Sequence, residues 1–391
     1  MVWFGGKMIQ PSVPLSPETV YAALDKNVID GLGSRMNANV LSRIVPRTTV
    51  RGVLVLLVAI SVAMAGSSSF GSRVATRGTT SQIRLTNGWT FSDLGALTPT
   101  DFSVATGINN TGLIVGNSGQ HAVTFKGGAV QRLDNDTNSV AAAVNDRGQI
   151  VGSLDPNNGP AVEFVNGHTV NIGQGVATDI NSSGTVVGWL NSPTGQHAVQ
   201  FLPTYRDLNP PGAYGSIAFA VNRAGQILLN VATQNSSGLV TDATFLSTRG
   251  QLTPLVKGPS TVFAFGLNDV GAAVGNDVTT LGEEPVIVRN GVVQQIPLLP
   301  GDTFDTPGGA DLRAINNPGT AVGQESGHAI VYLRGRLVDP NTWLPAGSNW
   351  RIVSLTAVNQ LNQMVGYATT CMNFVTTPCV YHAVLLDPFP R

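Results

Sequence analysis

A short motif recurs seven times after residue 100, and it constrains the fold more than any other feature of the chain. Each copy consists of an apolar residue, an asparagine and two variable residues, followed in six of the copies by a glycine. The copies begin at Ile108, Val144, Ile180, Val221, Leu267, Ile315 and Val358. Their spacing is roughly 40 residues, a period typical of architectures in which each repeat is one supersecondary unit.

The spacing of asparagine and glycine in the motif predicts a tight hairpin turn. Asparagine at the first position of a type I turn bonds the backbone through its side chain, and glycine at the fourth position adopts the left-handed conformation that closes a hairpin. The seventh copy has Asn362 in place of glycine, and asparagine is the next residue most tolerant of that conformation. Each motif therefore joins two antiparallel strands.

Other recurring segments complete four strands in each unit. The second strand ends in glycine, as in Leu113 to Gly116, a third starts at a residue such as His121, and a fourth follows a turn such as Val165 to Gly167. Four antiparallel strands in a unit of about 40 residues are typical of a propeller blade. The sequence thus predicts an all-β fold, a seven-bladed β-propeller of four-stranded antiparallel blades. Recurring glycines within strands indicate close backbone packing.

The two ends of the array indicate how the ring closes. The seventh unit runs out after its third strand, Tyr381 to Leu386, while an unassigned strand, Trp89 to Leu94, precedes the first unit. We expect this N-terminal strand to become the outer strand of the last blade. Small residues in the first strands, such as Ala105 and Gly107, suit crowding next to a central axis. A β-solenoid is the alternative, but its coils have a nearly constant length and these units do not.

The repeat resembles the HAF repeat of predicted extracellular bacterial proteins, named after a His-Ala-Phe tripeptide. Here the tripeptide is His-Ala-Val at His121, His197 and His382 and His-Ala-Ile at His328, while the other units lack the histidine. The segment from Asp339 to Ser348 also resembles the segment before the last unit of that family. The resemblance covers residues 83–388. It implies a secreted, β-propeller-like protein and names no activity.

The first 65 residues differ in kind from the rest of the chain. Arg43, Arg47 and Arg51 precede an uncharged apolar run that ends in Ala63-Met64-Ala65, the order found in secretory signal peptides. The run is shorter than the ~20 residues of a membrane span, and a membrane anchor is the alternative. We expect an unstructured extension at 1–35, a signal peptide at 36–65, a linker rich in Ser, Thr and Gly at 66–82, and a propeller at 83–388.

Export of the chain would determine its compartment and the oxidation state of its cysteines. Cleavage after Ala65 would leave an extracellular or periplasmic protein without a membrane segment, which we expect to be a monomer. Cys371 and Cys379 are the two cysteines of the chain. They lie close together in sequence, and a disulfide is their expected state in an oxidising compartment. A metal or redox pair is the weaker alternative because the spacing is not C-x-x-C.

Composition and motifs exclude several function classes. Charged residues make up 12% of the 391-residue chain and the formal net charge is -1, which disfavours helical bundles and nucleic-acid binding. The sequence has no G-x-S-x-G, H-E-x-x-H, P-loop or dinucleotide fingerprint. The repeat histidines begin the third strands of separate blades, too far apart to share a metal ion at bonds of about 2 Å. We therefore expect no metal and no cofactor.

Longer and more variable connections are expected to gather on one face. If the motif turns share a face with the turns between third and fourth strands, the loops between second and third strands and between blades form the other. Aromatic and acidic groups on those loops suit sugar binding or a protein interface. The candidate binding residues are Trp189, Tyr214, Glu283, Glu284, Asp302, Phe304, Asp305, Asp311 and Tyr367. Trp343 and Trp350 are expected to cover blade edges instead.

Two function classes fit this picture. The first is a secreted binding or scaffold protein whose loop-rich face engages a carbohydrate or an extracellular protein. The second is a secreted enzyme, a glycan hydrolase or lyase, with loop carboxylates as acid and base. The second class requires two carboxyl groups roughly 5 to 10 Å apart on that face.

Overall fold

The computed structural model describes residues 2–4, 7–9, 82–157, 159–193, 195–234, 236, 240–257, 261–279, 282–301, 309–370 and 380–388. The chain divides into two units, residues 1–55 and 56–391. The first unit contains a two-stranded antiparallel hairpin of β1 (Val2–Phe4) and β2 (Lys7–Ile9). The apolar run before Ala65, the residues Asp302, Phe304 and Asp305, and the pair Cys371 and Cys379 lie outside the described residues.

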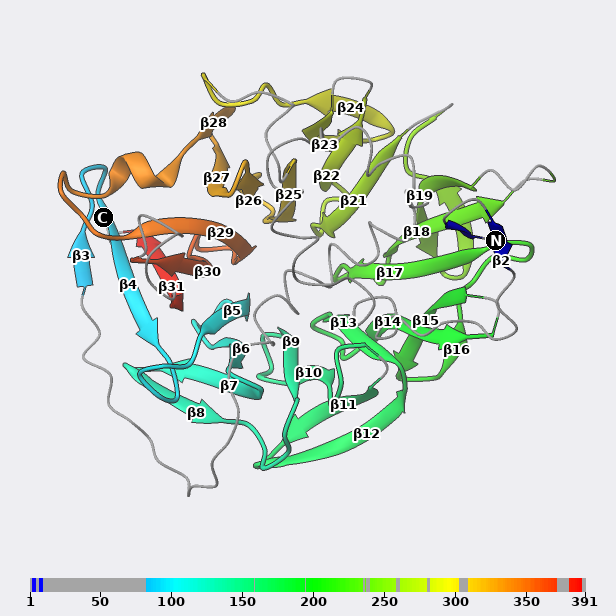
Figure 1. The fold of residues 1–391 in the computed structure, drawn as a ribbon, viewed down its shortest axis with the longest axis horizontal. Coiled ribbons are helices and arrows are strands. Elements are labelled where there is room, and N and C mark those ends of the chain that lie inside the picture. Colours follow the sequence, from blue (N-terminus) through cyan, green and yellow to red (C-terminus); the bar gives the residue numbers. More distant parts are fainter. Residues whose placement is uncertain are drawn as a thin grey trace. The chain divides into compact units, whose positions relative to one another are not determined.

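The second unit is a seven-bladed β-propeller, as predicted, and its blades surround a common centre (Figure 1). Within blades 1 to 6 the strands pair antiparallel in chain order. The strands of blades 1 to 3 are β5 (Ser103–Ile108), β6 (Ile114–Ser118), β7 (His121–Lys126), β8 (Ala129–Arg132); β9 (Val140–Val144), β10 (Ile150–Ser153), β11 (Pro160–Val165), β12 (His168–Gln174); and β13 (Val176–Ile180), β14 (Val186–Ser192), β15 (Gly195–Leu202), β16 (Arg206–Asp207).

Blades 4 to 6 repeat the same order of strands. They are β17 (Gly215–Val221), β18 (Ile227–Gln234), β19 (Val240–Thr248), β20 (Gln251–Pro254); β21 (Val262–Leu267), β22 (Ala273–Val278), β23 (Glu283–Arg289), β24 (Val292–Gln295); and β25 (Ala310–Ile315), β26 (Ala321–Glu325), β27 (His328–Leu333), β28 (Arg336–Val338). A 3₁₀ turn, η1 (Pro340–Trp343), follows blade 6. Within the described part of the chain, no helix is long and apolar enough to cross a membrane.

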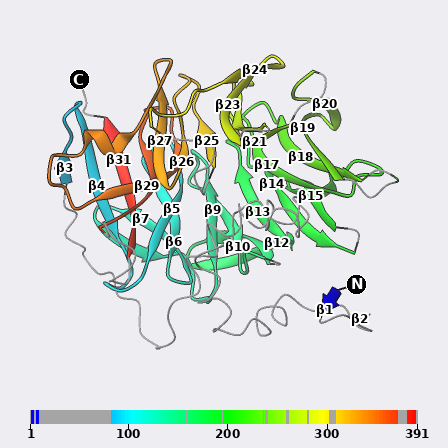
Figure 2. The same cartoon turned by 45° about the horizontal axis from the view of Figure 1, so that its top comes forward.

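Blade 7 combines strands from both ends of the repeat array. It orders β29 (Arg351–Val358), β30 (Met364–Thr369), β31 (Tyr381–Pro388), β4 (Trp89–Gly95) and β3 (Gln82–Arg84). The predicted closure is confirmed, because β4 pairs antiparallel with β31 and sets Phe91 opposite Leu386. Figures 1 and 2 show β4 beside β31. The additional strand β3 extends the blade outward beyond the predicted four strands.

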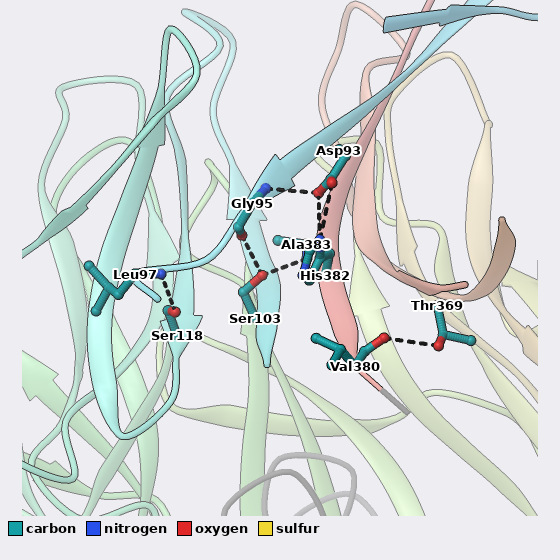
Figure 3. A network of polar contacts seen from close by, with 9 residues as sticks. All are labelled: Asp93, Gly95, Leu97, Ser103, Ser118, Thr369, Val380, His382 and Ala383. Atoms are coloured by element: carbon teal, nitrogen blue, oxygen red, sulfur yellow. Dashed lines mark hydrogen bonds and ion pairs between the residues drawn. The ribbon is translucent and has the colours of Figure 1, made fainter. Parts of the chain in front are cut away.

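Side chains reinforce this closure (Figure 3). Asp93 on β4 accepts hydrogen bonds from the backbone N–H of Gly95 at 2.8 Å and lies 3.0 Å from Nδ1 of His382 on β31. The hydroxyl of Ser103, the first residue of blade 1, donates to the carbonyl of Gly95 and accepts from the N–H of Ala383. Blade 7 is thereby joined both to its N-terminal strand and to blade 1.

The motif turns form as predicted. In the first copy, Oδ1 of Asn109 accepts from the N–H groups of Thr111 and Leu113 at 3.1 and 2.9 Å, and Gly112 is left-handed at φ +81°. Asn362, the residue that replaces glycine in the last copy, is left-handed too, at φ +64°. We call the side of the propeller that carries these turns the turn face, and the opposite side, with the longer connections, the loop face.

The same asparagines also join the blades, a role that the repeat pattern did not reveal. Each Nδ2 donates to the backbone carbonyl of the equivalent asparagine in the next blade, at 2.9 to 3.2 Å. The series runs through Asn109, Asn145, Asn181, Asn222, Asn268, Asn316 and Asn359 and returns to Asn109. All seven are buried, so this closed asparagine ring satisfies polar groups that water does not reach.

The strand glycines are confirmed as sites of close backbone packing. In six blades the second strand passes so close to the first that a Cβ on its glycine would overlap a backbone carbonyl oxygen. At Gly188, for example, the overlap is with Val176 of the neighbouring strand. The residue four positions before each ring asparagine is fully buried against the preceding blade, and it is alanine in blades 1 to 5, starting with Ala105. Small residues therefore crowd the inner strands, as expected.

Candidate functional site

Two of the predicted binding residues, Asp311 and Tyr367, come together where the inner strands surround the centre of the ring. Asp311 lies on β25 of blade 6, the innermost strand of that blade, and Tyr367 lies on β30 of blade 7. With Arg313 they form what we call the axial cluster. The first residues of the inner strands lie toward the loop face, so Asp311, the second residue of β25, is near that end of the ring centre.

Asp311 and Arg313 form a two-contact ion pair along one strand. Nε of Arg313 lies 2.9 Å from Oδ1 of Asp311, and Nη2 lies 3.4 Å from Oδ2. The two side chains are 20% and 16% exposed, so solvent can reach both. Burial lowers the pKa of Arg313, but the Asp311 carboxylate outweighs it and the net pKa is raised. The guanidinium is therefore charged throughout the physiological pH range.

Tyr367 is the aromatic member of the axial cluster. It pairs with Ser354 across β29 and β30 and is 8% exposed. Burial raises its pKa, the charges of Tyr381 and Asp311 raise it further, and Arg313 opposes them. Its ring meets that of Tyr381 edge-on, with centroids 5.9 Å apart. The phenol is thus neutral and can both donate and accept a hydrogen bond.

The position that Arg313 occupies in blade 6 holds different residues in the other blades. Three residues before the ring asparagine, blades 1, 3 and 7 have threonines that donate to a carbonyl of the following blade; Thr106, for example, lies 2.7 Å from the carbonyl of Ala141. Blades 4 and 5 have Phe219 and Phe265, whose rings meet edge-on at 5.5 Å. The sequence prediction missed Arg313. Comparing this position across the seven repeats would have revealed it, because blade 6 alone has a charged residue there.

The other described candidates lie apart from this cluster. Trp189 is 4% exposed inside blade 3 and offers no surface to a ligand, whereas Tyr214 is 48% exposed on the connection that leads into β17. Glu284 lies opposite Asp277 in the register of β22 and β23, the second and third strands of blade 5. The carboxylate of Glu283 lies against Gly309. Gly309 is two residues before Asp311 of the axial cluster.

Trp343 and Trp350 cover blade edges, as expected. Trp343 stacks on Trp89 of the closing strand with ring centroids 5.6 Å apart. Trp350 packs against Phe91 of the same strand at 5.3 Å.

Three of the repeat histidines, His121, His197 and His382, make hydrogen bonds in or next to their own blades. Nδ1 of His197 lies 3.0 Å from Asp207, and Nδ1 of His121 lies 3.0 Å from the carbonyl of Asp136. His382 contacts Asp93 in the same manner. Among the residues that the structure describes, no three His, Cys, Asp or Glu side chains are grouped so as to hold a metal ion.

Asp179 is a partly buried carboxylate that the sequence analysis did not single out. It lies on β13, two residues before a ring asparagine, where the other blades have glycine or alanine. Burial raises its pKa to about 6, although its oxygens accept from the N–H groups of Ile180 and Val221 at 2.8 Å. Because Val221 belongs to blade 4, Asp179 links two blades.

Comparisons with known proteins assign neither a family nor an activity to the chain. No family model and no curated protein matches the chain. A gluconolactonase from Xanthomonas campestris matches with a TM-score of 0.41 and 10% identity over 82% of this chain and 99% of its own. The extracellular domain of a protein described as a hybrid two-component system of B. thetaiotaomicron matches at 0.40 and 13% over 76% of this chain and 39% of its own. Neither likeness assigns a function.

Proposed function

We propose that this chain is a secreted binding protein whose loop face captures carbohydrate, with the axial cluster as the contact site. The observation that carries the proposal is the half-buried pair of Asp311 and Arg313 next to Tyr367. A guanidinium, a carboxylate and a phenol offer fixed donors and acceptors for the hydroxyl groups of a sugar. This combination is typical of small polar ligand sites.

A glycan hydrolase or lyase has less support. Such an enzyme needs one carboxyl group that holds a proton and a second that is ionised and free to act. Asp311 is engaged by Arg313 through both oxygens. Asp179 has the raised pKa of an acid, but its two oxygens accept backbone N–H groups. Binding without catalysis therefore accounts better for these groups.

Secretion belongs to the same proposal. It rests on the basic, apolar and small-residue segments that end at Ala65 and on the resemblance to the HAF repeat. N-terminal sequencing of exported protein should find a start near Gly66. Material that keeps residues 50–65 in the membrane fraction would instead support a signal anchor.

Screening the chain from Gly66 on a glycan array tests the binding function. We expect binding to at least one glycan class, with the signal lowered at least tenfold by Arg313→Gln and by Tyr367→Phe. Arg147→Gln, an exposed residue of a turn on the opposite face, is the matched control and should bind like the native chain. Tyr367→Phe removes a single hydroxyl, so a loss of binding there is not a loss of fold. Equal binding by all three variants would overturn the proposal.

A further inference from the structure

A pocket of about 450 Å³ opens between blades 6 and 7 and shares no residue with the axial cluster. Its walls come from the start of β27, from η1 with the segment after it, and from the start of β29. These are the loop-face ends of the strands. Its polar and aromatic lining includes His328, Asp339, Asn341, Ser348, Trp350 and Arg351. A volume of this size lies within the range of small-molecule sites, which begins at about 300 Å³.

One wall of the pocket is held by a network around η1. Oδ1 of Asp339 accepts from both the backbone N–H and Nδ2 of Asn341, each at 2.8 Å. Asn341 in turn bonds both backbone groups of Ile352 on β29, at 2.6 and 3.0 Å. Asp339 is therefore fixed in place before any ligand arrives, which lowers the entropy cost of binding.

Aromatic packing and one arginine hold the remaining walls. Trp350 packs against Phe91 and His382 in tilted contacts, with ring centroids 5.3 and 5.9 Å away. Arg351 donates from Nη2 to the carbonyl of Gly327 at 2.7 Å, which ties blade 7 to the turn before His328 in blade 6. The pocket is thus built into the interface of the two blades.

We propose that this pocket is a second ligand site and that it takes a neutral saccharide. Neighbouring hydroxyl groups of a sugar each donate and accept, so a carboxylate and a guanidinium in one pocket can pair with both functions. The charges of Asp339 and Arg351 balance, so the pocket favours an uncharged ligand over a uronate, which would face the Asp339 carboxylate. The indole of Trp350 supplies apolar surface for the ring.

Calorimetric titration of the exported chain, with tryptophan fluorescence as a second readout, tests this site. The probes are cellohexaose, xylohexaose and maltohexaose, with hexagalacturonate as the acidic comparison. We expect at least one neutral probe to bind and Asp339→Asn to weaken it about tenfold, the effect of one hydrogen bond to a charged group. Asparagine keeps the capping oxygen, so this variant retains η1. Arg351→Gln should weaken binding by a similar factor.

Two sets of controls separate this site from the axial cluster. Arg336→Gln removes an exposed arginine at the start of β28, at the turn-face end of the same blade, and should leave binding unchanged. Arg313→Gln and Tyr367→Phe should leave pocket binding unchanged too, whatever they do on the array. No binding of any neutral probe, preference for hexagalacturonate, or equal binding by Asp339→Asn would each overturn the proposal.

Discussion

The two faces of the propeller use the same repeat in opposite ways. On the turn face, seven nearly identical turns each place an asparagine in a closed ring of hydrogen bonds. On the loop face, the connections differ in length, and they carry the pocket between blades 6 and 7 and the open end of the axial cluster. Positions that are the same in every blade therefore stabilise the ring, and positions that vary between blades carry the candidate binding sites.

The largest expected effect comes from breaking the ring closure. Deleting residues 83–95 removes β4, so the edge of β31 is left without its partner. An exposed strand edge is an aggregation site. We therefore expect the unfolding transition to lose its cooperativity and the protein to aggregate on heating. Calorimetry and light scattering measure both. A control deletion of 66–80 removes none of the described strands and should behave like the full mature chain; equal behaviour of the two deletions would refute the closed ring.

A smaller but still large effect is expected in the asparagine ring. Asn222→Ala leaves an N–H group of its own turn and the carbonyl of Asn268 without their side-chain partner. Buried unsatisfied groups cost about 1–3 kcal/mol each, so we expect a loss of roughly 3 kcal/mol in chemical denaturation. Asn135→Ala, on an exposed connection, should cost almost nothing. Equal losses for the two would show that the ring contributes no special stability.

Asp179 should make stability depend on pH. Its pKa is raised from 3.8 to about 6 in the fold, so the folded state holds the proton more tightly than the unfolded chain. The contribution of Asp179 to stability should therefore be fully present below about pH 4 and be lost as the pH rises through 6, by on the order of 2 kcal/mol. Asp179→Ala, which gives blade 3 the residue found in blades 2, 4, 6 and 7, should flatten this dependence in urea titrations. An unchanged profile would contradict the assignment.

The smallest effect is expected at the partly exposed pair that fastens the closing strand. Asp93→Asn keeps an oxygen for the N–H of Gly95 but removes the charge next to His382. Ion pairs that are accessible to solvent stabilise a folded protein by at most about 1 kcal/mol. We expect a loss near 0.5 kcal/mol at pH 7, measured by urea unfolding, and a loss above 2 kcal/mol would mean that this contact controls closure.

The sequence predicted the blades well because the repeat encodes each residue's place within one unit. The turn at Asn109, the backbone contact at Gly188 and the pairing of Trp89 to Leu94 with the last blade all follow from local pattern and strand count. Contacts between units are not encoded in this way. The donation from each ring asparagine to the next blade, the bridge made by Asp179 and the position of Arg313 at the ring centre depend on how neighbouring blades rotate against each other. The same reason explains Trp189, which was predicted at the surface and lies inside blade 3.

The shared composition of blade 7 fixes the order in which the molecule can be completed during synthesis. Its outer strands, β3 and β4, leave the ribosome first, and its inner strands leave last. A nascent chain that has finished six blades still has an open seam, with β4 lacking its neighbour and the carbonyl of Asn109 lacking its donor from Asn359. Strands β29 to β31, residues 351–388, therefore complete the ring, and the seam between the two ends of the repeat array stays open until they have been synthesised.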